Sequence, residues 1–187
     1  MTVPLALDLG TLPTALAGGG APLLKRLTLL DGEQVRGLRI YSPDPAVAEA
    51  AGSRLVPRLP DEAEIAACRV LFVAGLPPDR SAELAAIARG HRVLVNVEDT
   101  LPLCDFHVPA ILRRGDLAIA ISTGGGSPTL SRRLRAYLAE LFPEAWTDRI
   151  ARIAEMRRQM RETGASNAEI ARVTDAVIDD EGWLPKP

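Results

Sequence analysis

The chain has 187 residues, of which 47% are hydrophobic and 25% are charged. This composition is typical of one medium globular domain, or of a domain with an appendage, and it excludes disordered and fibrous chains. The formal net charge of -2 and an aromatic content of only 4% give no overall footprint for nucleic-acid binding.

Apolar runs of strand length alternate with helical stretches over the first hundred residues. Strands are predicted at 12–17, 38–42, 69–74 and 92–97, and helices at 22–30 and 81–89. A glycine triplet, Gly18–Gly20, separates the first strand from the first helix. This order predicts the α/β class, with a Rossmann-like, doubly wound parallel sheet.

The remainder of the chain is predicted to be largely helical. Two further strands are expected at 105–110 and 117–122, and a second glycine turn, Gly124–Gly126, follows them. Ser127 and Pro128 suit the N-cap and the first turn of a helix. Helices are expected up to about residue 141, at 143–163 and at 167–179.

The first glycine turn is one place that could carry chemistry. Glycines before a helix let the backbone approach a pyrophosphate, whose charge the helix N-terminus favours. The third small residue of a G-x-G-x-x-G pattern would fall on Leu23, which is large, and the nearest acid after the second strand is Asp44. A dinucleotide site and a plain tight turn both fit these residues.

Two adjacent acids, Glu98 and Asp99, follow the strand at 92–97. Ligands of open α/β sheets bind at the carboxyl ends of strands, where a carboxylate can act as a general base or contact a metal. Neighbouring side chains of an extended chain point different ways, so at most one acid enters a site, and we favour Asp99. The alternative is a pair of solvated loop acids.

The second glycine turn is preceded by hydroxyl side chains and followed by arginines. Ser122, Thr123 and Gly124 resemble an anion-binding nest, and Arg132 follows on the next helix. The alternative is a well-capped helix with a solvated arginine face. From 113 to 162 the sequence holds ten arginines against six acids, which suits a small polyanion better than a nucleic acid.

The cysteines and histidines predict no metal centre. Cys68 and Cys104 form no CxxC or CxxH pattern, and we expect small buried thiols in a reducing cytoplasm. His91 and His107 alone cannot build a histidine-rich site. No apolar run reaches the roughly 18–20 residues of a membrane span, and the start of the chain lacks a basic signal region. We therefore expect a cytoplasmic protein with no membrane or nucleic-acid partner.

The stretch RVLVNVEDTLPLCDFHVPAILRRGDLAIAISTGGGSPTLSRRLRAYLAELFP resembles a known family. It carries an NV-x-D strand end, a CDF-x-x-PA-x-x-RRGDL segment and an AIST-G-G-x-SP-x-L-x-RR-L-R helix. These motifs are similar to the N-terminal half of siroheme synthase and its stand-alone relatives, the precorrin-2 dehydrogenase and sirohydrochlorin ferrochelatase family. PLALDL and GGGAPLLKRLTLL resemble the family's opening strand and cofactor turn more loosely, so the resemblance covers essentially the whole chain.

The resemblance implies an activity and a domain organisation. The activity is the NAD-dependent oxidation of precorrin-2 to sirohydrochlorin in siroheme biosynthesis, a tetrapyrrole pathway; some members are also ferrochelatases, with Fe²⁺ as the substrate metal. The organisation is a Rossmann-like NAD-binding domain at 1–112, a small α+β dimerisation segment at 113–142 and a helical C-terminal domain at 143–187, in a homodimer.

The resemblance also implies roles for individual residues. The family's catalytic aspartate falls on Asp99, which would contact a metal during chelation without any fixed metal site. Cofactor-binding positions at the strand ends fall on Gly18, Gly19, Gly20, Ala21, Pro22, Pro43, Asp44 and Ala74. Contacts to the carboxylates of a tetrapyrrole substrate are expected from Ser122, Thr123, Gly124, Arg113, Arg114 and Arg132.

The sequence departs from the family at the cofactor turn, and this keeps other functions open. Pro22 and Leu23 stand where the family has a valine and a small residue, and the strand at 69–74 ends without the usual Ala-Thr-Asp-Asp type of turn. The first alternative is a chelatase or tetrapyrrole-binding protein with a degenerate NAD site. A second is a phosphosugar-binding module, suggested by ISTGGGSP. A third, a helix-turn-helix at 166–178, lies in an acidic segment that opposes phosphate contact.

Overall fold

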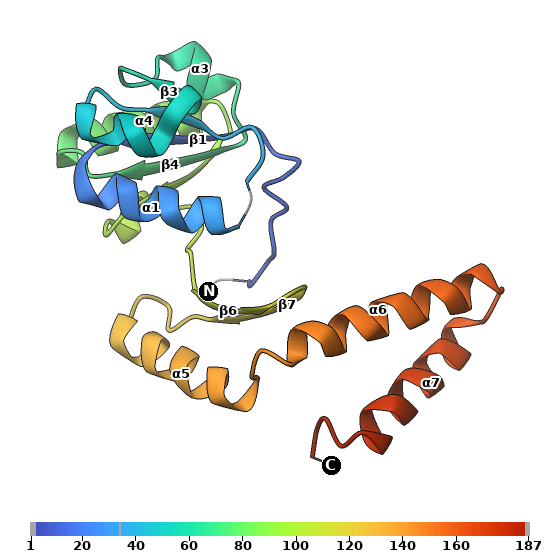
Figure 1. The fold of residues 1–187 in the computed structure, drawn as a ribbon. Helices are drawn as coiled ribbons and strands as arrows, with labels where there is room; N and C mark the ends of the chain where they lie inside the picture. The colour runs from blue at the N-terminus through green and yellow to red at the C-terminus, as the bar shows by residue number, and fades with distance from the viewer. Residues whose placement is uncertain (1–2, 34, 186–187) are drawn as a thin grey trace. The chain divides into compact units, whose positions relative to one another are not determined.

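The computed structural model describes residues 3–33 and 35–185 (Figure 1). The chain divides into two compact units, unit 1 up to Val108 and unit 2 from Pro109. The predicted division into three parts, at 1–112, 113–142 and 143–187, stays a prediction. No described helix is both long and apolar enough to cross a membrane.

Unit 1 contains one five-stranded sheet in the order β3-β2-β1-β4-β5. Every neighbouring pair of strands is parallel. The strands are β1 (Thr14–Gly18), β2 (Arg39–Tyr41), β3 (Leu55–Val56), β4 (Val70–Ala74) and β5 (Leu94–Val97). The chain runs outward from β1 through β2 to β3 and then returns to the other side of β1, so the strand order reverses between β1 and β4. Ligands of doubly wound sheets bind at such a reversal.

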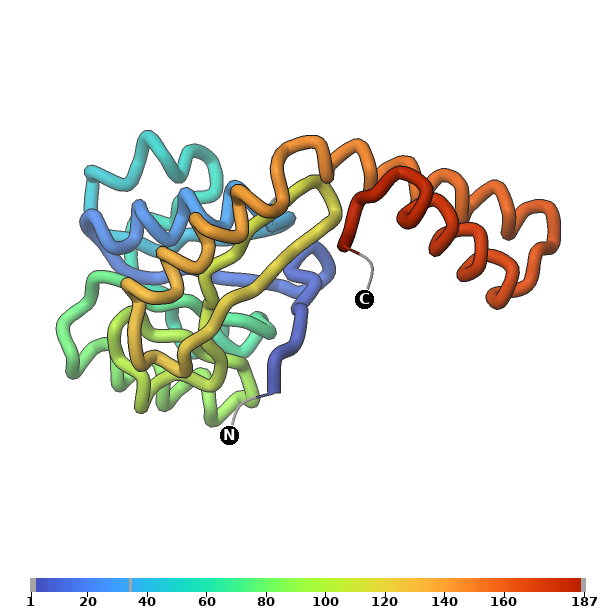
Figure 2. The backbone as a smooth tube through the Cα atoms, turned by 90° about the horizontal axis from the view of Figure 1, so that it is seen from below, coloured from blue at the N-terminus to red at the C-terminus, as the bar shows by residue number. Residues whose placement is uncertain are grey.

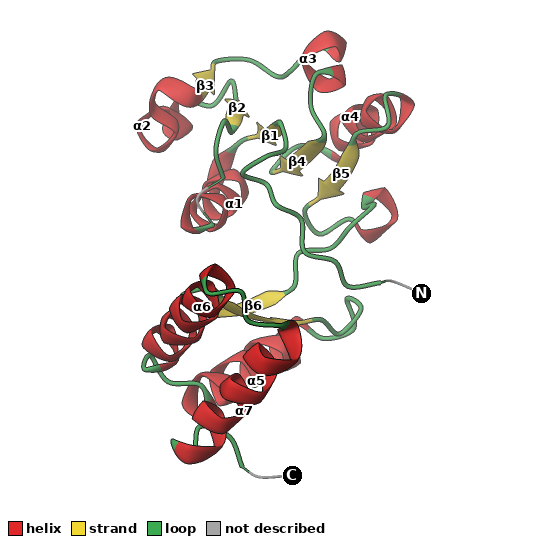
Figure 3. Ribbon diagram, turned by 90° about the vertical axis from the view of Figure 1, so that its right-hand side faces the viewer, coloured by secondary structure: helices red, strands yellow, loops and turns green. Residues whose placement is uncertain are grey.

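Helices cover both faces of this sheet, as the end-on view in Figure 3 shows. They are α1 (Gly20–Gly32), α2 (Ala48–Ala51), α3 (Glu62–Ala66) and α4 (Pro78–Gly90). Under α1 and α2 lies one apolar core that includes Leu23, Leu27 and Phe72. Under α3 and α4 lies a second core that includes Leu71, Leu84 and Val95. Because β1 and β4 are buried on both sides, their sequences are almost wholly apolar rather than alternating.

The predicted Rossmann-like α/β class is confirmed, and one predicted strand is wrong. Residues 105–109 form no strand, because Asp105 binds the edge of β5 instead of entering a ladder: its amide donates to the Val95 carbonyl at 2.8 Å, and its carboxylate accepts from the Val95 amide at 3.0 Å. The short β3 and α3 carry too few residues to show a period and were not predicted.

Unit 2 begins with an antiparallel hairpin of β6 (Ala110–Arg114) and β7 (Leu117–Ile121). Gly115, with a φ of +57°, makes the tight turn between these strands. Three helices follow: α5 (Pro128–Leu141), α6 (Trp146–Glu162) and α7 (Asn167–Asp180). Figures 1 and 2 show α6 and α7 side by side as an antiparallel pair.

The segment that follows α7 folds back onto the start of α6 through Trp183. The guanidinium of Arg149 lies 5.1 Å from the ring centre of Trp146 and 5.3 Å from that of Trp183. Both indole rings are almost fully buried. The Trp183 indole N–H donates to Glu181 at 3.0 Å, and Glu181 also pairs with Arg152. These cation–π contacts hold the segment after α7 against the start of α6.

Candidate functional site

At the carboxyl edge of the unit 1 sheet, the β1–α1 turn with Gly18–Gly20 lies against the turn that follows β4, which holds Gly75. A Cβ at Gly18 would lie 1.7 Å from the Ala74 carbonyl oxygen, and a Cβ at Gly75 would lie 2.1 Å from the Gly19 carbonyl oxygen. The Gly19 amide donates to the Ala74 carbonyl at 3.1 Å. Only glycine permits this backbone contact, which draws the β1–α1 turn against the end of β4 at the point where the strand order reverses.

Helix α1 begins in this turn with most of its first amides already bound. Gly19 is the N-cap and offers no side chain, and the Gly20 amide donates to Asp44 Oδ2 at 2.8 Å. Pro22 has no N–H to offer. Within 3–33 and 35–185, the Ala21 amide is left without a protein acceptor. The helix terminus therefore keeps its dipole and one free donor for a ligand phosphate.

Asp44 joins the end of β2 to the start of α1. Its Oδ1 accepts from the Ala46 amide at 2.9 Å while its Oδ2 accepts from Gly20. The Asp44 amide in turn donates to the hydroxyl of the buried Ser42 at 3.1 Å. The backbone hydrogen bonds, first from Ala46 and then from Gly20, lower the pKa of the Asp44 carboxyl below its ordinary value. Asp44 is therefore an ionised acceptor beside the glycine turn.

These residues fit a dinucleotide. A Cβ at Gly19 would point toward Asp44, with Asp44 Cβ at 3.4 Å and Oδ2 at 3.6 Å, so the missing side chain leaves space between the turn and an acid that follows β2. An acid in this place accepts from a ribose hydroxyl in Rossmann-type sites. The large Leu23 does not disturb the turn, because its side chain is fully buried beneath α1.

The predicted catalytic acid follows β5, the edge strand beside β4. Asp99 is exposed, and its φ of +57° is unusual for a residue other than glycine. Within the described residues its carboxylate makes no hydrogen bond or ion pair. A carboxylate at a strand end with no protein partner can accept a proton from a ligand.

The neighbouring Glu98 points a different way from Asp99. Its carboxylate is 13% exposed and lies 3.6 Å from the Lys25 ammonium on α1, while its second oxygen is buried without a partner among the described residues. Arg26 lies 5.5 Å over the Phe72 ring, where burial lowers the pKa of its guanidinium and the charge of Glu98 opposes that shift. Sequence reasoning missed this cluster, because only the fold brings α1 beside the end of β5.

The hydroxyl-rich turn of unit 2 is held by its own hydrogen bonds. Thr123 Oγ1 accepts from the Ser127 amide at 3.1 Å, and the Gly124 amide donates to Ser122 Oγ at 3.2 Å. Ser127 caps α5 by accepting from the Leu130 amide, as predicted from the sequence. The turn is therefore preshaped, and its role toward substrate stays a prediction.

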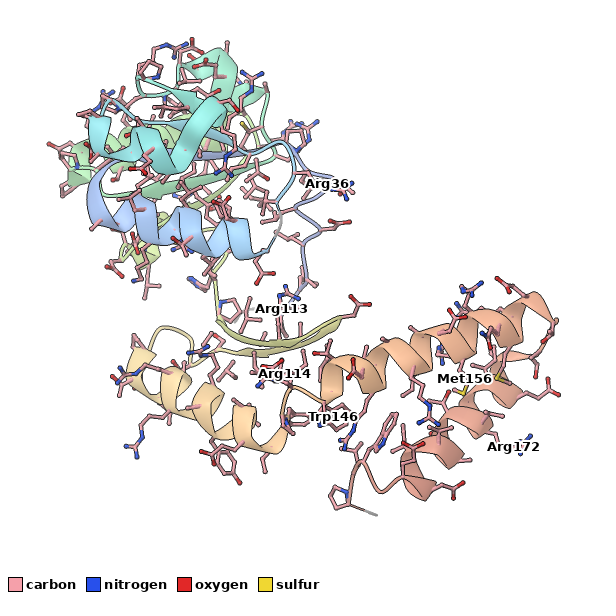
Figure 4. All side chains as sticks on the ribbon, in the orientation of Figure 1. Arg36, Arg113, Arg114, Trp146, Met156 and Arg172 are labelled. Carbon is pink, nitrogen blue, oxygen red and sulfur yellow. The ribbon has the colours of Figure 1, made fainter. Side chains whose placement is uncertain are left out.

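The three candidate arginines of unit 2 differ in their surroundings. Figure 4 shows Arg113 and Arg114 on opposite faces of the hairpin. Arg114 donates to the Phe142 carbonyl at 2.7 Å and lies 3.1 Å from the Glu144 carboxylate, so it ties β6 to the α5–α6 connection. Arg132 is exposed on α5. The predicted contacts of all three with substrate stay predictions.

No cluster of metal-binding side chains is found in the part of the chain that the structure describes. His107 is exposed, and the His91 ring pairs with Glu62 at 2.8 Å. Neither histidine lies among the residues of the candidate cofactor turn.

Comparison with known proteins identifies the unit that holds this turn. Residues 5–110, more than half of the chain, match the family model described as "Putative NAD(P)-binding". The chain belongs to this NAD(P)-binding family. Residues 114–141 of the NAD(P)-binding chain match a second model, described as "Sirohaem biosynthesis protein central". Both matches agree with the family resemblance predicted from the sequence, which is thereby confirmed.

Individual relatives support the same assignment. The siroheme synthase of Methylococcus capsulatus is 31% identical over 164 residues, which cover 86% of this chain and 35% of that protein. The siroheme synthase of Pseudomonas putida strain F1 is 34% identical over 150 residues, covering 77% of this chain and 32% of the relative. The NAD(P)-binding chain thus spans about a third of the length of these curated relatives.

A solved structure shares the fold of the NAD(P)-binding chain. The protein named SirC, precorrin-2 dehydrogenase, superposes with a TM-score of 0.76 at 22% sequence identity. The superposition covers 98% of this chain and 93% of that one, so both units have counterparts there.

Proposed function

We propose that the protein oxidises precorrin-2 to sirohydrochlorin with NAD as the oxidant, in siroheme biosynthesis in the cytoplasm. The observation that carries this proposal is the carboxyl edge of the unit 1 sheet. There the glycine turn with Asp44 fits a dinucleotide, and the partnerless carboxylate of Asp99 follows the edge strand. The relatives named siroheme synthase and the fold of SirC support the same substrate class.

The chain's own residues divide the work as follows. The diphosphate of the cofactor would be held at the start of α1 by the glycine turn and the two residues after it, Gly18, Gly19, Gly20, Ala21 and Pro22. Pro43 and Asp44 would hold the adenosine ribose, and the Ala74 carbonyl holds the turn by accepting from the Gly19 amide. When bound, NAD supplies the hydride acceptor. Asp99 accepts the proton that the substrate loses, because dehydrogenation removes a hydride and a proton together.

The substrate is an anionic macrocycle, and unit 2 offers the donors that such a ligand requires. We assign the contacts with its carboxylates to Ser122, Thr123, Gly124, Arg113, Arg114 and Arg132. Unit 2 also carries the surface for a homodimer. On α5, Leu130, Leu134, Tyr137 and Leu141 are 49%, 37%, 58% and 53% exposed, and their spacing places them on one face.

A second activity, insertion of Fe²⁺ into sirohydrochlorin, is a candidate at the same carboxylate. Metal insertion requires removal of pyrrole N–H protons, which Asp99 can accept as it does in the oxidation. A chelatase with a degenerate NAD site remains the alternative function, since Pro22 removes one phosphate donor from α1.

The deciding experiment incubates the purified protein with precorrin-2 and NAD and follows the absorption spectrum of sirohydrochlorin. We expect oxidation that depends on NAD, and the assay is repeated with Fe²⁺ or Co²⁺ to detect metal insertion. Metal insertion without any oxidation would overturn the dehydrogenase proposal and favour the chelatase.

Replacing the proposed base tests its role directly. Asp99→Ala and Asp99→Asn are expected to lower turnover by at least about a hundred-fold, in line with the loss of a general base. Because Asp99 is exposed, both variants should keep the wild-type circular dichroism spectrum and NAD affinity. Normal turnover in either folded variant would show that another group takes the proton.

A further inference from the structure

The turn that carries Asp99 is short and lies in an unusual backbone conformation. It runs from Val97 to Thr100, where the Thr100 amide donates to the Val97 carbonyl at 3.3 Å. Asp99 is one of two residues other than glycine with a positive φ in the described chain; the other is Arg92. Such a conformation persists only where surrounding groups hold it. The carboxylate makes no hydrogen bond that could do so, so the support must come from the backbone on either side.

The thiol of Cys104 supplies that support. Its Sγ accepts from the Val97 amide at 3.3 Å and lies 3.1 Å from the Val97 carbonyl oxygen and 3.4 Å from that of Thr100, either of which can accept its S–H. Asn96 Nδ2 also approaches the sulfur, at 3.6 Å. One side chain thus contacts the backbone at both ends of the turn that presents Asp99.

Cys104 is itself held firmly by the residues that follow it. Asp105 pairs with both backbone groups of Val95 and accepts from the Arg89 guanidinium at 2.9 Å. The Phe106 carbonyl accepts from the side-chain amide of the buried Asn96 at 2.9 Å. The Phe106 ring packs edge-on against the Phe72 ring, with 5.4 Å between the ring centres. The segment 104–106 is therefore fixed to the edge of β5, so the thiol has a constant position from which to hold the turn.

We propose that Cys104 is a positioning residue that sets the place of the Asp99 carboxylate for proton transfer. This inference rests on the proposed function, because it assigns Asp99 the role of the base. The proposed role of the thiol is to hold the backbone of the turn, and it differs from packing in the core and from redox chemistry. A misplaced base loses rate steeply even when substrate and cofactor still bind.

The chain contains a matched control, since Cys68 is its only other cysteine. The Cys68 thiol is buried in the core under α3 and α4, where it donates to one helical carbonyl, that of Glu64, at 3.3 Å. Cys68→Ala therefore removes a buried thiol of the same size without touching the Asp99 turn. Cys104→Ala removes the contacts with Val97 and Thr100, and Cys104→Ser keeps a hydroxyl able to replace them.

The experiment measures kcat, KM, the pH profile of kcat, NAD affinity and the unfolding midpoint for all three variants. We expect Cys104→Ala to lower kcat about ten- to a hundred-fold and to alter the pH profile, with NAD affinity unchanged. Cys104→Ser should stay within about five-fold of the wild type. Cys68→Ala should keep the wild-type kcat and pH profile. If Cys104→Ala fails to fold, Cys104→Val takes its place: it fills the space of the thiol but forms none of its hydrogen bonds, so it should lower kcat and alter the pH profile as Cys104→Ala is expected to do.

Amide hydrogen exchange provides a readout that needs no turnover. The amides of 97–100 should exchange faster in Cys104→Ala and at the wild-type rate in Cys68→Ala. A wild-type kcat, pH profile and exchange rate in Cys104→Ala, or an equal loss of kcat in Cys68→Ala, would overturn the positioning role. An inactive wild-type protein would instead overturn the proposed function, and the exchange comparison would then decide alone whether Cys104 holds the turn.

Discussion

Asp44 binds two backbone amides at once, one at the start of α1 and one just after β2. The carboxylate therefore does two things: it fixes the turn, and it places a negative charge where the adenosine ribose is expected. A ribose 2′-hydroxyl can donate to this acceptor, whereas a 2′-phosphate would be repelled by it. We therefore expect the protein to prefer NAD to NADP.

Asp44→Asn tests this preference. The substitution removes the charge and one acceptor oxygen, so NAD affinity should fall on the order of ten-fold while NADP affinity is kept or improved. Titration calorimetry with each nucleotide measures both. Asp61→Asn is the control, because Asp61 is also a capping aspartate of unit 1 and caps α3 instead of α1. An unchanged ratio of the two affinities in Asp44→Asn would exclude Asp44 as the source of the preference.

The same residue gives a pH dependence of stability. Because the pKa of Asp44 is lowered in the folded state, its contribution to stability is fully present above the ordinary aspartate value. That contribution is lost as the pH falls through the lowered value. The difference in urea midpoint between the wild type and Asp44→Asn should therefore shrink on acidification.

At the scale of elements, five strands (β1, β2, β4, β5 and β7) and the five long helices (α1, α4, α5, α6 and α7) could be predicted from the sequence, whereas β3, β6, α2 and α3 could not. β4 is a continuous apolar run, β1 and β5 are interrupted only by Thr14, Gly18 and Asn96, and α5 begins with a recognisable N-cap at Ser127. The strand expected at 105–110 was wrong because a side chain, that of Asp105, takes the place of a ladder partner. Periodicity cannot show which backbone amide a side chain binds.

The candidate site was predictable only in part, for a related reason. The glycine turn and the strand-end acids are marked in the sequence by residue type and order. The Cys104 contacts with Val97, and the approach of Lys25 to Glu98, join residues that no local pattern connects. They exist because α1 and the segment after β5 meet at the edge of one sheet.

The contact between the β1–α1 turn and the turn at Gly75 can be tested with two glycines that share a backbone conformation. Gly75 has a φ of +71° and Gly37 a φ of +70°, but a Cβ at Gly37 would meet nothing within 4 Å. Gly37→Ala should cost about 1–2 kcal/mol, which is the strain of the left-handed conformation alone. Gly75→Ala should cost more, on the order of 3 kcal/mol or above, because the methyl group would strike the Gly19 carbonyl.

Urea unfolding followed by circular dichroism measures both free energies of unfolding. Where Gly75→Ala still folds, it should also bind NAD more weakly than Gly37→Ala does, since the β1–α1 turn must move away from β4. Equal losses of stability in the two variants would show that the turns do not depend on their close approach.

At the scale of the whole molecule, α5 carries four exposed apolar side chains along one face, Leu130, Leu134, Tyr137 and Leu141. Leu134 and Tyr137 stand at the centre of its stripe of four side chains, and a second copy of the chain would bury them. Leu134→Glu and Tyr137→Glu should each shift a homodimer toward monomer, because a buried unpaired carboxylate is costly. Sedimentation velocity measures the mass of the wild type and of each variant, and so distinguishes dimer from monomer.

Ala136→Glu is the matched control for this prediction. Ala136 is exposed on the same helix but lies on the side away from the stripe, so the added charge should leave the dimer intact. A monomeric wild-type protein, or equal dissociation of all three variants, would rule out this face as the interface.

Both tryptophans of the chain, Trp146 and Trp183, lie in unit 2, where each ring contacts the guanidinium of Arg149. Intrinsic tryptophan fluorescence therefore reports on unit 2 alone, because unit 1 contains no tryptophan. Unfolding curves recorded by fluorescence and by circular dichroism should separate if the units melt independently. Reduced nicotinamide absorbs where tryptophan emits, so energy transfer to a cofactor bound in unit 1 would measure how the two units approach each other in solution.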